Sequence, residues 1–284
     1  MTATVPTITL NNGVEMPQLG LGVFQMSDQE VRDTIPKALD AGDRLIDTAS
    51  RYYNEKAVGH ALAEAAVPRE ELFVTTKLWF KDHGYERTKE AFQVSLDNLG
   101  LDHLDLWLVH QPFGDYYGSW RAMEELLDEG LVRAIGVSNF FDDRYADLVA
   151  HSRTAPALNQ RETHPLNQQI ATQELLSAHG TVLQAWAPLG QGNPDILQHP
   201  VLAGIAAAHG KSVPQVVLRW LVQRGASAVV KSTRAERLRE NIDVFDFELT
   251  DAEMAQIAAL DRNQAGGDFD HRDPRMLELL LTLD

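Results

Sequence analysis

Eight short apolar runs alternate with helical patterns along this chain of 284 residues, and the alternation predicts an α/β fold, a (β/α)8 barrel of the TIM type. The runs are apolar almost without interruption, as in parallel strands that helices cover from outside. The length suits one barrel of about 250 residues, and the 44% hydrophobic content supplies a large core. We therefore expect one domain over residues 1–284, with the barrel over about 18–261 and a tail over 262–284.

The first element in the chain is an expected hairpin. Thr7–Leu10 and Val14–Met16 flank Asn11-Asn12-Gly13, and an Asn-Gly pair between short alternating runs is a hairpin signal. We expect this hairpin to close the bottom of the barrel.

The strands and helices of the barrel follow in alternation. Segments such as 86–99 and 168–179 carry apolar residues at three- and four-residue spacing, which predicts helices. Pro36 falls within the first expected helix and should kink it or shift its boundary. Residues 194–210 look like an extra helical insertion after the seventh strand. The expected strands cover residues 19–24, 44–48, 72–78, 104–110, 134–139, 157–162, 182–187 and 228–232.

Composition excludes several classes of protein. The chain has no cysteine, which excludes disulfides, iron–sulfur clusters and thiolate zinc sites. A net charge of −16 argues against a nucleic-acid partner. The first ten residues show no signal peptide and no apolar stretch would span a bilayer, so we expect a cytoplasmic protein without a membrane partner. The sequence contains neither a Gly-x-Gly-x-x-Gly turn nor a Walker loop, which argues against dinucleotide binding by a Rossmann fold.

Four ionisable residues stand at the ends of three successive expected strands: Asp47, with Tyr52 just beyond it, Lys77 and His110. Singly, each has a structural explanation, such as an ion pair or a core histidine. In a parallel barrel, however, the carboxyl ends of the strands meet on one face. There Asp47 would hold the Lys77 ammonium, and this cation would lower the pKa of Tyr52 and make it a usable general acid. Such a group suits protonation of a carbonyl oxygen while hydride arrives at the carbon.

Three motifs give this pattern a family resemblance. Residues 45–52 with Asn54-Glu55, residues 76–79 and residues 131–140 resemble the signatures of the aldo-keto reductases. The resemblance runs from Thr7 to about Asp261. Within the family, the chain is most similar to bacterial 2,5-diketo-D-gluconate reductases and related short-loop reductases. It implies NADPH as cofactor, no metal and a monomer. It also implies that Tyr52 donates the proton, that Lys77 and Asp47 tune it, and that His110 orients the substrate.

The cofactor positions transfer from the same resemblance. Neutral polar groups at strand ends suit the carboxamide of nicotinamide, and cations between the eighth strand and a helix suit a phosphate. The resemblance assigns the carboxamide to Ser138, Asn139 and Gln160 and ring stacking to Trp186. The remaining cofactor positions are Pro188, Leu189 and Gly190 after Trp186, Lys231, Ser232, Arg234 and Arg237 for the ribose 2′-phosphate, and Glu240 and Asn241 for adenine.

The substrate side is less defined. Gln111 stands where the family often has tryptophan, and Asp43 stands where an aromatic residue is usual. The short stretch 111–119 implies an open pocket and broad specificity. The tail motif 270–274 either closes over the mouth or extends into solvent, and its Arg272 or His271 would attract a carboxylate. Besides His110, the expected lining residues are Phe24, Trp79 and Gln111, with Phe113, Tyr117 and Trp186 around them.

These observations favour an NADPH-dependent oxidoreductase that reduces small aldehydes, ketones or keto-sugar acids such as 2,5-diketo-D-gluconate, or methylglyoxal. One alternative is a cofactor-binding sensor or regulatory subunit with little turnover. Another is an unrelated phosphate-binding barrel enzyme such as an isomerase, although it would not require Trp186 or the Ser138, Asn139 and Gln160 set.

Overall fold

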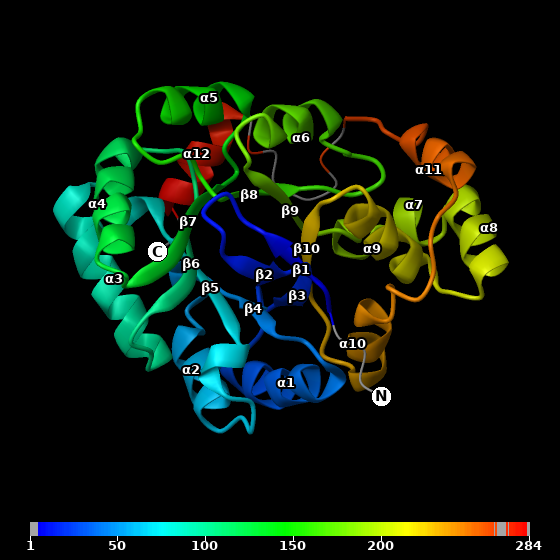
Figure 1. Cartoon of the computed structure of the whole chain (residues 1–284), viewed down its shortest axis with the longest axis horizontal. Helices are drawn as coiled ribbons and strands as arrows, with labels where there is room; N and C mark the ends of the chain where they lie inside the picture. Colours follow the sequence, from blue (N-terminus) through cyan, green and yellow to red (C-terminus); the bar gives the residue numbers. More distant parts are fainter. Residues whose placement is uncertain (1–4, 264, 266–270, 272, 283–284) are drawn as a thin grey trace.

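A closed barrel of eight parallel strands forms the centre of the computed structural model, which describes residues 5–263, 265, 271 and 273–282 (Figure 1). Each strand pairs with the next in the chain, and the last pairs with the first. The predicted (β/α)8 barrel is confirmed, with strand boundaries displaced by at most two residues. The barrel strands are β3 (Leu19–Gly22), β4 (Leu45–Asp47), β5 (Phe73–Leu78), β6 (Leu104–Val109), β7 (Val132–Ser138), β8 (Leu158–Glu162), β9 (Val182–Trp186) and β10 (Ser227–Val230).

Helices surround the strands as an outer ring (Figure 1). The expected insertion after β9 consists of two helices, α7 and α8. No single helix in the described part of the chain is both long and apolar enough to cross a membrane, although α8 and α9 together, bent by 87°, pass that test by length and composition. The helices are α1 (Asp28–Ala41), α2 (Glu55–Ala63), α3 (Tyr85–Leu99), α4 (Tyr116–Asp128), α5 (Asp142–Ala150), α6 (Ile170–Ser177), α7 (Pro194–Leu197), α8 (Pro200–His209), α9 (Val213–Gln223), α10 (Ala235–Ile242), α11 (Asp251–Ala258) and α12 (Pro274–Thr282).

One of the two effects expected of Pro36, a shift of the helix boundary, does not occur. Pro36 does not shift the boundary of α1, which continues to Ala41. Proline removes the N–H that would bond the carbonyl of Arg32, four residues earlier. Both residues lie on the exposed side of α1, where water can satisfy that carbonyl.

The hairpin of β1 (Thr7–Thr9) and β2 (Glu15–Pro17) closes one end of the barrel, as expected. Leu10 and Met16 are buried in one cluster with Leu45 and Phe73, the first residues of β4 and β5. Because these contacts lie at the amino ends of parallel strands, the hairpin plugs the bottom. The carboxyl ends, where a barrel carries its chemistry, stay on the opposite face.

Candidate active site

Parallel strands bring the four predicted ionisable residues to one face of the barrel. Asp47 ends β4, and the 3-10 turn Ser50–Tyr52 follows it. Lys77 is the penultimate residue of β5, and His110 directly follows the last residue of β6. The pairing of β4 with β5 and of β5 with β6 places these strand ends side by side.

Lys77 is the centre of the group. Its fully buried ammonium Nζ lies 2.6 Å from Asp47 Oδ1, 2.8 Å from the carbonyl oxygen of Thr48 and 3.4 Å from Tyr52 Oη. The second oxygen of Asp47 accepts a hydrogen bond of 2.8 Å from Gln160 Nε2. Burial acts to lower the pKa of Lys77, but the charges and hydrogen bonds of Asp47 and Tyr52 together outweigh it, so this pKa is raised. Lys77 therefore remains an ammonium beside the Tyr52 hydroxyl.

The pKa of Tyr52 departs from the expectation. We expected the Lys77 cation to lower it, but burial raises the pKa of Tyr52 above 10.0, and the attraction of Lys77 only partly opposes this. Asp47, whose charge disfavours a phenolate, adds to the increase. The expected net direction was wrong because desolvation outweighs one ammonium that is itself paired. Tyr52 thus holds its proton firmly at neutral pH.

The imidazole of His110 lies beside the ring of Tyr52. Its ring centre is 5.8 Å from that of Tyr52 and 5.3 Å from that of Trp79. Burial, and next the charge of Lys77, hold the pKa of His110 well below 6.5. The imidazole is therefore neutral at pH 7. Its Nδ1 is buried and has no hydrogen-bond partner among the described residues. This favours the tautomer with the proton on Nε2, because an unpaired acceptor costs less than an unpaired donor.

A second polar group follows on the next strand ends. Asn139 Nδ2 donates to the His110 carbonyl and to Ser138 Oγ, both at 3.1 Å, and Asn139 Oδ1 accepts from Trp186 Nε1 at 3.0 Å. Ser138 Oγ donates to the backbone oxygen of Gln160. Asn139 adopts a positive φ of 60°, which lets its amide reach both neighbours. The four predicted carboxamide and stacking residues are thus one hydrogen-bonded unit.

Three groups that take part in the hydrogen bonds of the site were not predicted from the sequence. Gln160 Nε2 also donates to Gln184 Oε1 at 2.6 Å, and Gln184 Nε2 donates to Ser227 Oγ at 3.0 Å. The carbonyl of Thr48 is the third, as an acceptor for Lys77. A polar residue inside the apolar run Val182–Ala185 was the available signal for Gln184. A backbone carbonyl gives no such signal.

The proposed phosphate segment lies between β10 and α10. Lys231 is exposed and donates to the carbonyl of Gln25 at 2.9 Å, while Ser232 Oγ accepts from the backbone N–H of Arg234 at 3.2 Å. Arg234 and Arg237 are exposed and, within the described residues, neither has an acidic side chain within 4.0 Å. Cations without counter-ions at a helix start suit an anion. The other predicted residues lie at α10, where Glu240 is exposed and Asn241 buried, and beyond β9, where Pro188, Leu189 and Gly190 follow Trp186.

The described part of the C-terminal segment lies beside the aromatic residues expected to line the pocket. Met276 and Leu280 of α12 pack with Trp79, Phe80 and Phe113. His271 Nδ1 lies 3.2 Å from Oε1 of the buried Gln111. Of the two arrangements left open for the tail, the described part adopts the one beside the mouth. Asp270 and Arg272 lie outside the described residues.

The aromatic lining is only partly as expected. The ring centre of Phe24, which is 41% exposed, lies 4.9 Å from that of Tyr52. The buried Trp79 finds no partner for its Nε1 in the part of the chain that the structure describes. Tyr117 was a wrong expectation: its hydroxyl donates to Asp147, and its ring stacks on Tyr116 of the same helix. The hydrogen bond thus draws Tyr117 to α5 instead of to Trp79.

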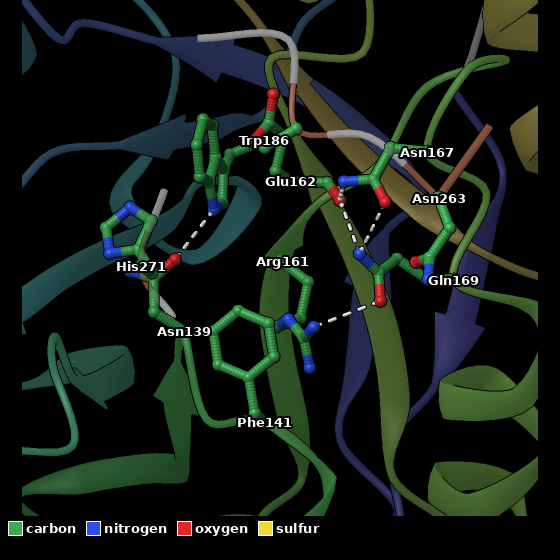
Figure 2. Close-up of a pocket in the computed structure, with 10 residues that line it drawn as sticks. Asn139, Phe141, Arg161, Glu162, Asn167, Gln169, Trp186, Asn263 and His271 are labelled. Carbon is green, nitrogen blue, oxygen red and sulfur yellow. Dashed lines mark hydrogen bonds between the residues drawn. The ribbon is translucent and has the colours of Figure 1, made fainter. Parts of the chain in front are cut away.

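A polar hollow adjoins Trp186. In Figure 2, Trp186, Asn139 and His271 line one side, and Arg161 and Gln169 lie across from them. Arg161 Nη2 donates to Gln169 Oε1 at 3.0 Å. Within the described chain, no group of three or more histidine, aspartate or glutamate side chains is arranged to hold a metal ion.

Comparison with known proteins connects this geometry to a family. Residues 16–262 match the model described as "Aldo/keto reductase family". Morphine 6-dehydrogenase of Pseudomonas putida is 47% identical, covering 92% of this chain and 93% of that protein. Glyoxal reductase of Bacillus subtilis is 44% identical, covering 94% and 96%. An aldo-keto reductase of Bombyx mori, solved in complex with NADP, superposes with a TM-score of 0.89 at 38% identity, covering 93% and 95%.

Proposed function

The chain belongs to the aldo/keto reductase family, and on that premise we propose that it reduces aldehydes, ketones and keto acids to alcohols with NADPH, using Tyr52 as proton donor. One observation carries the proposal: a buried ammonium, Lys77, is held between Asp47 and the hydroxyl of Tyr52. A structural ion pair would not require a tyrosine hydroxyl beside the ammonium at the mouth of a barrel.

The residues present fit NADPH, which supplies a hydride when bound. The ring of Trp186 is half-buried and anchored by Asn139, so it offers an aromatic surface to a nicotinamide. Ser138 and Gln160 would hold the carboxamide, although the Gln160 NH2 group is already used by Asp47 and Gln184, which leaves its carbonyl oxygen. Arg234 and Arg237 would hold the 2′-phosphate.

Tyr52 and its neighbours would then manage the proton. Because burial raises the pKa of Tyr52, the phenol keeps its proton until negative charge develops on the carbonyl oxygen of the substrate. That oxygen is more basic than a phenolate, so the proton moves to it. Lys77 stabilises the negative charge left on Tyr52, and neutral His110 donates a hydrogen bond that orients the same oxygen.

Replacement of one hydroxyl tests this role. Tyr52→Phe should bind NADPH, as followed by its fluorescence, but lose at least about 100-fold in kcat, since general acid catalysis contributes about 10²–10⁴. Tyr85→Phe is the matched control, because it removes a hydroxyl that bonds Glu125 on the outer helices. Normal turnover by Tyr52→Phe would refute the mechanism.

The names of two relatives direct the choice of substrates. Glyoxal and a polycyclic alcohol differ greatly in size, which supports broad specificity and a panel that includes methylglyoxal, aromatic aldehydes and a diketo acid. NADPH consumption by the wild-type protein with any of these supports a reductase. Tight NADPH binding without consumption across the whole panel would instead favour a sensor subunit.

A further inference from the structure

Arg51 stands directly before Tyr52 in the 3-10 turn Ser50–Tyr52, at the mouth of the barrel. Its guanidinium carbon lies 4.7 Å from the ring centre of Tyr53 and 5.8 Å from that of Trp79. Two aromatic rings therefore hold the half-buried side chain in place. Cation–ring contacts of this kind position a guanidinium without using its N–H donors.

Among the residues that the structure describes, the guanidinium of Arg51 has no hydrogen-bond acceptor. Within the described residues, Arg51 donates no hydrogen bond, has no carboxylate within 4.0 Å, and has a buried Nε without a partner. Two other arginines of this acidic chain do contact an acid: Arg69 and Arg133 both lie 2.7 Å from Asp105. A net charge of −16 makes an unpaired arginine at a cleft notable. Unlike the buried Nε, the two Nη groups of Arg51 are available to a ligand.

The position of Arg51 relates it to the reacting groups. The ring of Trp79, which Arg51 adjoins, is 5.3 Å from that of His110, and the charge of Arg51 contributes to the low pKa of this histidine. Lys77, the cation beneath, is already neutralised by Asp47. Arg51 therefore contributes a positive charge, which no acid of the described residues pairs, next to the place where Tyr52 and His110 converge.

We propose that Arg51 binds a carboxylate of the substrate, so that this protein prefers carbonyl compounds that carry a carboxylate over their neutral counterparts. The inference rests on the proposed reductase function and adds a specificity-determining residue to it. The planar fork of a guanidinium matches the two oxygens of a carboxylate. A phosphate dianion in a molecule of this negative charge would require further cations beside Arg51.

The test compares two aldehydes that differ in one charge, 4-carboxybenzaldehyde and methyl 4-formylbenzoate. The readout is the ratio of their kcat/KM values with NADPH. Arg51→Leu should lower this ratio about 10- to 100-fold, the range expected for a lost charge-assisted hydrogen bond, mainly through KM for the acid. Arg51→Lys should keep part of the preference, because it retains the charge without the fork. The ratio of the wild-type protein should also fall as salt is added.

Arg121→Leu is the matched control, since it removes the same charge from the exposed outer face of α4. An unchanged ratio in Arg51→Leu and Arg51→Lys would overturn the proposal, as would an equal fall in Arg121→Leu, which would reveal a long-range field. Equal losses for acid and ester would assign Arg51 a structural role instead. If the wild-type protein reduces neither aldehyde nor any other carbonyl, the proposed function itself fails, and that outcome is distinct from a lost preference.

Discussion

The surroundings of Asp43 predict how the free energy of unfolding depends on pH. It lies between α1 and β4 and is only 3% exposed. The guanidinium of the adjacent Arg44 donates to the carbonyls of Leu39 and Asp43 itself, at 3.0 and 2.7 Å, and not to the carboxylate. Burial raises the pKa of Asp43 from 3.8 to about 8, with Arg44 opposing weakly.

The sign of the effect follows from linkage. The folded protein binds this proton more tightly than the unfolded chain, so the free energy of unfolding falls as pH rises from about 4 and levels off above about 8. Each unit of pKa difference is worth about 1.4 kcal/mol, which gives about 4 kcal/mol between pH 5 and pH 8.5. Structural relaxation around the ionised group would reduce this, so we expect about 2–4 kcal/mol.

Urea unfolding of the wild-type protein and Asp43→Asn at both pH values measures this quantity. The amide has the same shape but does not titrate, so the other ionisable groups cancel in the difference between the two proteins. Asp43→Asn should become more stable relative to the wild type by about 2–4 kcal/mol on going from pH 5 to pH 8.5. A stability difference that stays constant within about 0.5 kcal/mol would refute the reasoning.

Two further predictions concern the cofactor and the histidine. Arg237→Ala should raise KM for NADPH about tenfold or more while leaving KM for NADH nearly unchanged, because only NADPH carries the 2′-phosphate. Steady-state kinetics with both cofactors measures this, and an equal rise for both would contradict the assignment. Because burial and Lys77 keep His110 neutral, kcat/KM should show no protonation step near pH 6.5. A pH profile with a step there that disappears in His110→Gln would contradict the neutral imidazole.

Much of the site could be predicted because its residues lie at strand ends, which can be identified from short stretches of the sequence. The apolar runs are read from the chain, and parallel pairing then sends every carboxyl end to one face. Asp47, Lys77 and His110 meet for that reason alone. The family motifs added the identities of Ser138, Asn139 and the residues after β10.

Other features depend on contacts that no local pattern contains. Gln160 bonds Asp47 across 113 residues and connects the two polar groups of the mouth. The described part of the tail lies beside Trp79 because Met276 and Leu280 find apolar partners there. The hydroxyl of Tyr117 finds Asp147 instead of the pocket.

The sequence alone determined the barrel, the face expected to hold the chemistry and the residue types on that face. It could do so because strand patterns and strand ends are properties of the chain. Only the tertiary structure decided the direction of the Tyr52 pKa, the neutrality of His110 and the absence of an acid within reach of Arg51 among the described residues. These depend on desolvation and on charge separations of a few ångströms, which are set by all the atoms packed around a group.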